Sequence, residues 1–157
     1  MNSLPMIPIP LDAMRTAAEY SRAHLVYLAG QPTWTRIPRF QRRELDPTEV
    51  FQVDCKGFAL NTAQLLFQDM SDRVGGASEN ALRRSIRIGF FDCDPTDGTP
   101  EDHVACMAHS GSDWHMVADT MDPDPLGLGT LQTVPSRLTG WVDLTDLTTM
   151  HVAEGVA

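Results

Sequence analysis

Three residues of this chain have the types needed for nucleophilic attack on a carbonyl group: Cys55, His103 and Asp119. A cysteine thiolate attacks the carbonyl carbon, an imidazole transfers the protons, and a carboxylate holds the imidazole in orientation. Such a set cleaves or exchanges amide bonds through a thioester. Whether the three residues act together depends on the elements that carry them.

Cys55 lies at the start of a predicted helix within residues 51–70. Apolar residues recur there at helical spacing: Ala59, Leu60, Ala63, Leu66, Phe67 and Met70. Asp54 occupies the N-cap position, where its carboxylate can accept a hydrogen bond from a backbone N–H. The partial positive charge at a helix N-terminus favours a thiolate over a thiol, which makes Cys55 a candidate nucleophile. The alternative is a small buried hydrophobic residue, as most free cysteines are.

The segments His103–His109 and Asp113–Asp119 predict a β-hairpin, because each alternates and a short loop around Gly111 separates them. A turn centred on Gly111 collects apolar residues on one face: Val104, Cys106, Ala108, Trp114, Met116 and Ala118. A one-residue slip mixes polar and apolar residues, so we expect the centred register. It places His103 directly opposite Asp119, with Cβ atoms about 4.5–5.5 Å apart.

The remaining histidines and cysteines of this region are expected to take no part in the chemistry. His109 and His115 lie nearer the turn, about 12 Å or more from His103 at about 3.3 Å per residue, and are interpreted as surface residues. Cys106 falls on the apolar face of the hairpin, Cys93 lies in an acidic loop, and Trp114 is expected in the core.

Length and composition limit the class of protein. A chain of 157 residues, 42% of them hydrophobic, predicts one domain over residues 1–157 with a proline-rich arm at 1–10. The net charge of −9 argues against nucleic-acid binding. We find no signal peptide and no apolar stretch of about 20 residues, so we expect a cytoplasmic protein without membrane contact.

Metal and cofactor sites are not expected. The three cysteines form no CxxC motif and suit a reducing compartment. The acidic stretch 92–102 departs from the spacing of an EF-hand loop.

Other segments supply the scaffold of a predicted α+β domain, in which the Cys55 helix packs on a small antiparallel sheet. A helix is predicted from Asp12 to about Leu28, and a helical turn beginning at Pro47. A Gly/Ser loop is predicted over Ser71–Asn80 and a strand over Ser85–Asp92.

The order of helix cysteine, strand histidine and strand aspartate resembles the transglutaminase-like cysteine proteinases of bacteria, a branch of the papain-like fold. Members carry a Thr-Pro-Glu type turn before a Gly-Asp-Cys-Glu-Asp-Phe-Ala motif, similar here to residues 46–51 and 53–60. His103-Val104-Ala105 and Val117-Ala118-Asp119 are similar to the downstream motifs. Lys56 and Gly57 replace the acidic residues that bind calcium in some members, so the resemblance does not by itself imply calcium binding.

The resemblance implies that Cys55 is the nucleophile, His103 the general base and Asp119 its orienter, acting on a protein or peptide substrate without a cofactor. The backbone N–H of Cys55 would be one oxyanion donor, and a side-chain N–H of Gln52 or Trp34 the second. Two other functions stay open. One is glutamine acyl transfer or deamidation, and the other is a non-catalytic binding or assembly module that keeps the fold. The oligomeric state cannot be derived from the sequence.

Overall fold

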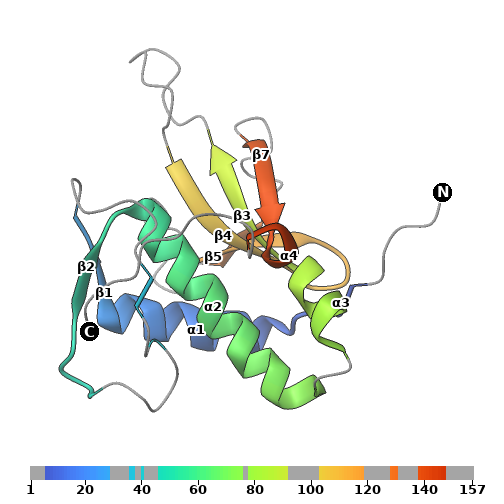
Figure 1. The fold of residues 1–157 in the computed structure, drawn as a ribbon, viewed down its shortest axis with the longest axis horizontal. Helices are drawn as coiled ribbons and strands as arrows, with labels where there is room; N and C mark the ends of the chain where they lie inside the picture. The colour runs from blue at the N-terminus through green and yellow to red at the C-terminus, as the bar shows by residue number, and fades with distance from the viewer. Residues whose placement is uncertain are drawn as a thin grey trace.

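The computed structural model of the chain describes residues 6–28, 36–37, 40, 46–75, 78–91, 103–118, 128–130 and 138–147; at 103, 128–130 and 146–147 only the backbone is described. These residues form a mixed structure of helices and small sheets (Figure 1). The predicted α+β class is confirmed.

A five-stranded antiparallel sheet forms one layer, with strand order β6-β5-β4-β3-β7. Its strands are β3 (Ile86–Phe91), β4 (His103–His109), β5 (Trp114–Val117), β6 (Leu128–Thr130) and β7 (Leu138–Asp143). The predicted strand over 85–92 and the first hairpin strand are confirmed, while the second hairpin strand is shorter than predicted. The short helix α4 (Leu144–Leu147) follows β7 directly.

Helix α2 (Cys55–Val74) packs against β4 on one side and helix α1 (Leu11–His24) on another. Because two layers cover it, α2 buries polar residues as well as its apolar stripe. Asn61 and Thr62 are fully buried, and the Thr62 hydroxyl donates to the Ser21 hydroxyl of α1 at 2.8 Å. The helix is therefore less one-sided than the sequence pattern suggests.

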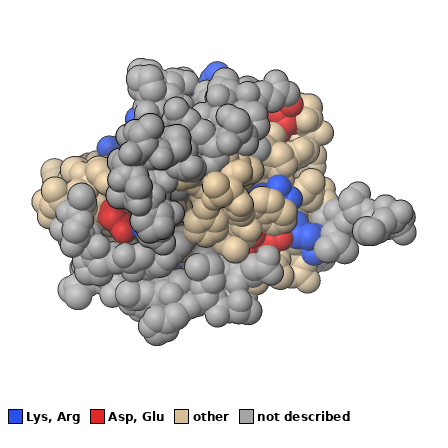
Figure 2. Space-filling model, turned by 90° about the horizontal axis from the view of Figure 1, so that it is seen from above, with Lys and Arg blue, Asp and Glu red and all other residues tan. Residues whose placement is uncertain are grey.

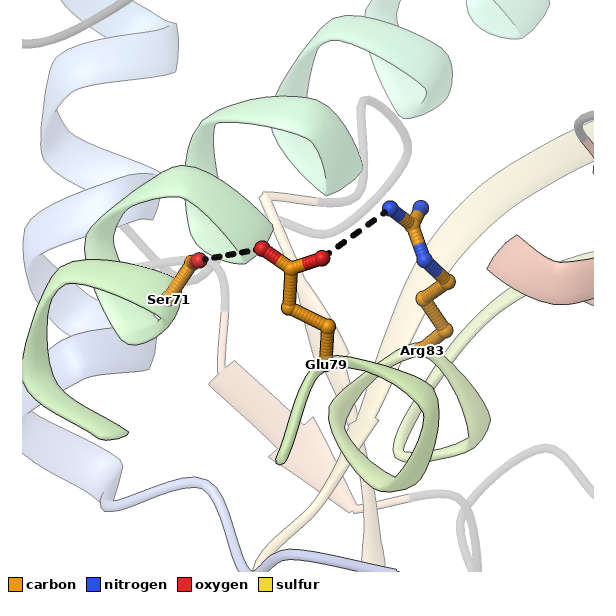
Figure 3. Close-up of polar contacts among 3 residues, drawn as sticks. All are labelled: Ser71, Glu79 and Arg83. Atoms are coloured by element: carbon orange, nitrogen blue, oxygen red, sulfur yellow. Dashed lines mark hydrogen bonds and ion pairs between the residues drawn. The ribbon is translucent and has the colours of Figure 1, made fainter. Parts of the chain in front are cut away.

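A third helix, α3 (Glu79–Arg84), folds back against the last turns of α2. The Glu79 carboxylate accepts from Ser71 at 3.3 Å and pairs with Arg83 at 3.9 Å (Figure 3). The Arg83 guanidinium also lies over the Phe67 ring, 4.3 Å from its centroid. The predicted loop over Ser71–Asn80 is therefore wrong at both ends, because α2 continues to Val74 and α3 begins at Glu79.

The first helix ends four residues earlier than predicted. After His24 the chain becomes β1 (Leu25–Tyr27), which pairs in parallel with β2 (Phe51–Val53) as a separate two-stranded sheet. The strand β2 follows a turn at 46–49, closed by the Glu49 N–H on the Asp46 carbonyl at 3.0 Å, where a helical turn was predicted. Backbone pairing between segments distant in sequence thus overrides the helical pattern of 25–28.

The β4–β5 hairpin has a register one residue away from the predicted one. Met107 pairs with Met116 and His109 with Trp114, and the Ser110 N–H donates to the Asp113 carbonyl at 2.9 Å. The physical reason is that both faces of the sheet are apolar. Val104, Cys106, Ala108 and Val117 join the main core with α2, and Ala105, Met107, Met116 and Phe91 form a second cluster on the opposite face. A slip therefore buries no additional polar residue.

The N-terminal arm packs on the domain over its described part. Ile9 is fully buried, and its N–H donates to the His109 carbonyl at 2.8 Å. The Ile7 N–H donates to the Ser85 hydroxyl at 2.8 Å. The arm therefore anchors the turn end of the hairpin.

Candidate active site

The start of α2 places a partly exposed thiol at a well-formed helix terminus. Asp54 is the predicted N-cap, and its Oδ1 accepts from the Gly57 N–H at 2.8 Å while its carbonyl accepts from the Phe58 N–H at 2.9 Å. Cys55 is the first residue of α2, is not in a disulfide and packs at the margin of the main core. The first N–H groups of a helix lack intrahelical acceptors. The Cys55 N–H is thus available in principle to a developing oxyanion.

A buried amide holds a neighbouring chain segment against the first turns of α2. Asn61 donates through Nδ2 to the Gly57 carbonyl at 2.7 Å and accepts through Oδ1 from the Ile37 N–H at 2.8 Å. Ile37 and Phe40 are both buried in the main core. Asn61 was not among the residues singled out in the sequence, although an asparagine within an apolar helical pattern is a signal of such a bridge.

Cys55 and His103 begin two elements that pack together. The helix α3 connects the end of α2 to the start of β3, and Ile86 at that start pairs with Ala108 near the end of β4. The ends of α2 and β4 therefore lie at one end of the helix–sheet interface, and their starts lie at the other. Figure 1 shows both starts on the same side of the molecule.

The pairing of β4 with β3 also shows to which face of the sheet position 103 belongs. His103 pairs with Phe91, and alternate residues of a strand share a face. Phe91 and Ala105 belong to the cluster on the face opposite α2, so by alternation position 103 belongs to that face as well. The side chain of His103 lies outside the described residues.

The predicted pairing of His103 with Asp119 is wrong in its register. The ladder of β4 with β5 ends at the pair Cys106 and Val117, and Ala118 then turns the chain with a φ of 56°. Asp119 lies outside the described residues.

The two candidate oxyanion residues differ in what the structure says of them. Gln52 is exposed in the middle of β2, where it pairs with Val26. Val53 and Leu25 are buried on the inner face of this small sheet, so Gln52 belongs to its outer face. Trp34 lies outside the described residues.

The other thiols and histidines are placed as follows. Cys106 is fully buried, as predicted, and burial raises the pKa of its thiol far above the usual range, which removes it as a nucleophile. Cys93 lies outside the described residues. His109 and His115, predicted at the surface, are half-buried; the His109 Nδ1 accepts from the Gly111 N–H at 3.1 Å, and the His115 Nε2 is 3.2 Å from the Ser110 hydroxyl.

Sequence reasoning also missed a stacked cation on the second face of the sheet. The Arg87 guanidinium carbon lies 4.0 Å from the ring centroid of Trp114 and 3.4 Å from that of Trp141. Trp114 is half-buried rather than a core residue. Burial lowers the pKa of Arg87, and the Asp143 carboxylate opposes that shift. No sequence signal joins these residues, because they come together only through the β3–β4–β5 and β3–β7 pairings.

Within the described ranges, no group of three or more His, Cys, Asp or Glu side chains is placed to hold a metal ion. None of the helices described is both long and apolar enough to cross a membrane. Figure 2 shows basic and acidic side chains interspersed on the described part of the surface it faces. Comparison of the chain with protein-family models, with curated proteins and with solved structures found no match.

Proposed function

We propose that this protein is a cysteine hydrolase of the transglutaminase-like kind, with Cys55 as nucleophile, His103 as general base and Asp119 as its orienter. The observation that carries the proposal is the shared end of α2 and β4. A partly exposed cysteine opens the helix, a histidine opens the strand, and the helix packs along that strand.

In this mechanism the Cys55 thiolate attacks the carbonyl carbon of a peptide or carboxamide bond. The carbonyl oxygen becomes an oxyanion held by the Cys55 N–H, and the His103 imidazolium gives its proton to the leaving amine. The product is a thioester. Water, deprotonated by His103, then attacks the thioester, releases the acid and returns the thiol; an amine in place of water gives acyl transfer.

A non-catalytic module is the second candidate, and one observation favours it. Position 103 belongs to the sheet face opposite α2, whereas a base for Cys55 has to reach the side on which α2 packs. A module of this kind would keep the helix–sheet packing without a reactive thiol.

Thiol alkylation separates the two functions. Native protein is treated briefly with iodoacetamide at about pH 6, and labelling of each cysteine is followed by peptide mass spectrometry; at this pH unactivated thiols are largely protonated. We expect Cys55 to label faster than Cys93. We expect His103→Ala to slow the labelling of Cys55 by about tenfold, equivalent to about 1.4 kcal/mol of thiolate stabilisation.

The control variant is His109→Ala, which removes a histidine from the other end of the same strand. It should leave the labelling rate of Cys55 unchanged. Equal rates for Cys55 and Cys93, together with no effect of His103→Ala, would rule out the catalytic function and leave the non-catalytic module.

A further inference from the structure

Exposed apolar side chains gather on the small β1–β2 sheet. Among the large hydrophobic residues exposed in the described part of the chain, four lie on this sheet or directly beside it: Val26 (48%), Tyr27 (51%), Leu28 (42%) and Val50 (53%). Exposure of this extent on neighbouring strands is unusual, since single exposed apolar residues need no explanation but groups of them mark interaction sites.

Three of these residues share the outer face of the sheet. Val26 pairs with Gln52 on that face, while Leu25 and Val53 occupy the buried inner face. Leu28 and Val50 continue the same alternation, and the Leu28 N–H donates to the Val53 carbonyl at 2.9 Å, so the pairing extends beyond Tyr27. The outer face therefore carries an apolar strip made of Val26, Leu28 and Val50, with the exposed Gln52 opposite Val26.

The same sheet presents a strand edge. Among the described strands, β1 and β2 pair only with each other. In a parallel pair, alternate residues direct both backbone groups to the partner. The bond from Leu28 to Val53 assigns Val53 to the paired edge, so the N–H and C=O of Gln52 point to the outer edge of β2.

This edge leads directly to the proposed nucleophile. Only Asp54 separates the last residue of β2 from Cys55, and Figure 1 shows β2 running into the start of α2 at the margin of the molecule. Gln52 precedes Cys55 by three residues, which is about 10 Å of extended chain at about 3.3 Å per residue.

We propose that the outer edge of β2 binds the substrate as an added β-strand: an extended peptide with apolar side chains at alternate positions and no excess of acidic residues. The apolar strip contacts the alternate side chains, while the Gln52 N–H donates to a peptide carbonyl and the Gln52 carbonyl accepts from a peptide N–H. The net charge of −9 disfavours an acidic peptide. The inference rests on the proposed function, since it assigns a substrate class to Cys55.

The test measures binding without turnover. Protein carrying Cys55→Ala is titrated into a fluorescein-labelled peptide, Lys-Val-Thr-Val-Thr-Val-Lys, and anisotropy is recorded. The paired substitution Val26→Ser with Val50→Ser should weaken binding by at least about tenfold, because it removes much of the apolar strip. Leu11→Ser, at an equally exposed apolar residue of α1, should have no effect.

Peptides N-methylated on alternate amides test the strand geometry on unaltered β1 and β2. An added strand directs every second amide to its partner strand. Methylation of the amides that face β2 should therefore abolish binding, and methylation of the other set should leave binding intact. Equal effects of both sets, or binding unaffected by the serine pair, would overturn the inference. So would a dimer, detected by sedimentation, that the serine pair dissociates, because the edge would then belong to a second copy.

The outcomes separate the two proposals. Peptide binding with an unreactive Cys55 would leave the edge as a peptide-binding site and remove the hydrolase. A reactive Cys55 without binding at the edge would keep the hydrolase and remove this substrate class.

Discussion

Replacing Asn61 by aspartate tests the buried bridge beside the candidate nucleophile. The Asn61 side chain is fully buried, donates to the Gly57 carbonyl at 2.7 Å and accepts from the Ile37 N–H at 2.8 Å. Asparagine and aspartate have nearly the same shape, so Asn61→Asp changes little except the donor. The ionised carboxylate keeps the bond from Ile37 but faces the Gly57 carbonyl with a second acceptor.

The magnitude follows from these two contacts. Leaving a buried polar group unsatisfied costs about 1–3 kcal/mol, and an uncompensated buried charge costs about 3–5 kcal/mol. We therefore expect Asn61→Asp to lower the free energy of unfolding by about 3–5 kcal/mol at neutral pH. Asn61→Ala leaves the Ile37 N–H without its acceptor and creates a small cavity, so it should lower the free energy of unfolding by about 2–4 kcal/mol.

The stability loss caused by Asn61→Asp, relative to wild type, should also depend on pH, whereas the loss caused by Asn61→Ala should not. A buried carboxyl facing a carbonyl favours its protonated form, so its folded pKa lies above its unfolded value of about 3.9. The stability it contributes is present below that unfolded value and is lost as the pH rises through the folded pKa. Each unit of pKa elevation corresponds to about 1.4 kcal/mol of this loss.

Urea unfolding at about pH 4 and about pH 7.5 measures these differences, with wild type run at each pH so that other groups cancel. The matched control is Gln64→Glu, a half-buried amide on the same helix. If Asn61→Asp stays within about 0.5 kcal/mol of wild type at both values of pH, the amide bridge does not hold the Ile37 segment as described.

Two further predictions concern the five-stranded sheet. A Cβ at Gly89 would lie 2.9 Å from the sulfur of Met107, so Gly89→Ala should lower the free energy of unfolding, measured with urea, by about 1–3 kcal/mol. A Cβ at Gly140 would have nothing within 4 Å, so Gly140→Ala should cause no such loss, and equal losses for the two variants would contradict this packing. Burial and then the nearby Arg87 cation lower the pKa of His109, while the Asp113 carboxylate opposes this shift. Neutral His109 therefore stabilises the folded state above its unfolded pKa of about 6.5, and this stabilisation is lost as the pH falls through the folded pKa. Wild type should therefore lose more thermal stability than His109→Gln between about pH 7.5 and about pH 5, and an upward shift in the NMR titration of His109 would contradict the assignment.

Features set by neighbouring residues could be predicted from the sequence. The start of α2 depends on the Asp54 carboxylate and on the helical spacing that follows, both of which act within one or two turns. The strands at 86–91 and 103–109 depend on their own alternation or apolar content. Their predicted bounds agree with the structure to within one residue.

Features set by distant pairings could not be predicted in this way. Leu25–Tyr27 continues the helical pattern of α1, yet it becomes a strand because it pairs with residues 51–53. Asn61 and Thr62 fall on the polar side of the α2 pattern, yet both are buried because α1 and the segment at Ile37 cover that side. In each case the partner lies at least 24 residues away in the chain.

The hairpin register was wrong for a different reason. The prediction assumed one buried and one solvated face, which penalises a slip. The sheet instead has apolar side chains on both faces, with Met107 and Met116 buried together away from α2. Alternation then no longer distinguishes the two registers, and the loop closure between Ser110 and Asp113 accompanies the observed one.

This error bears unequally on the two proposed partners of Cys55. The end of the sheet at which His103 lies follows from the α3 connection and from the pairing of Ile86 with Ala108, neither of which involves β5. Asp119 was assigned through the β4–β5 register, and with that register corrected its role rests on the family resemblance alone. The Cys55–His103 pair is therefore the part of the proposal to test first, and alkylation of Cys55 with and without His103 tests it without assuming any role for Asp119.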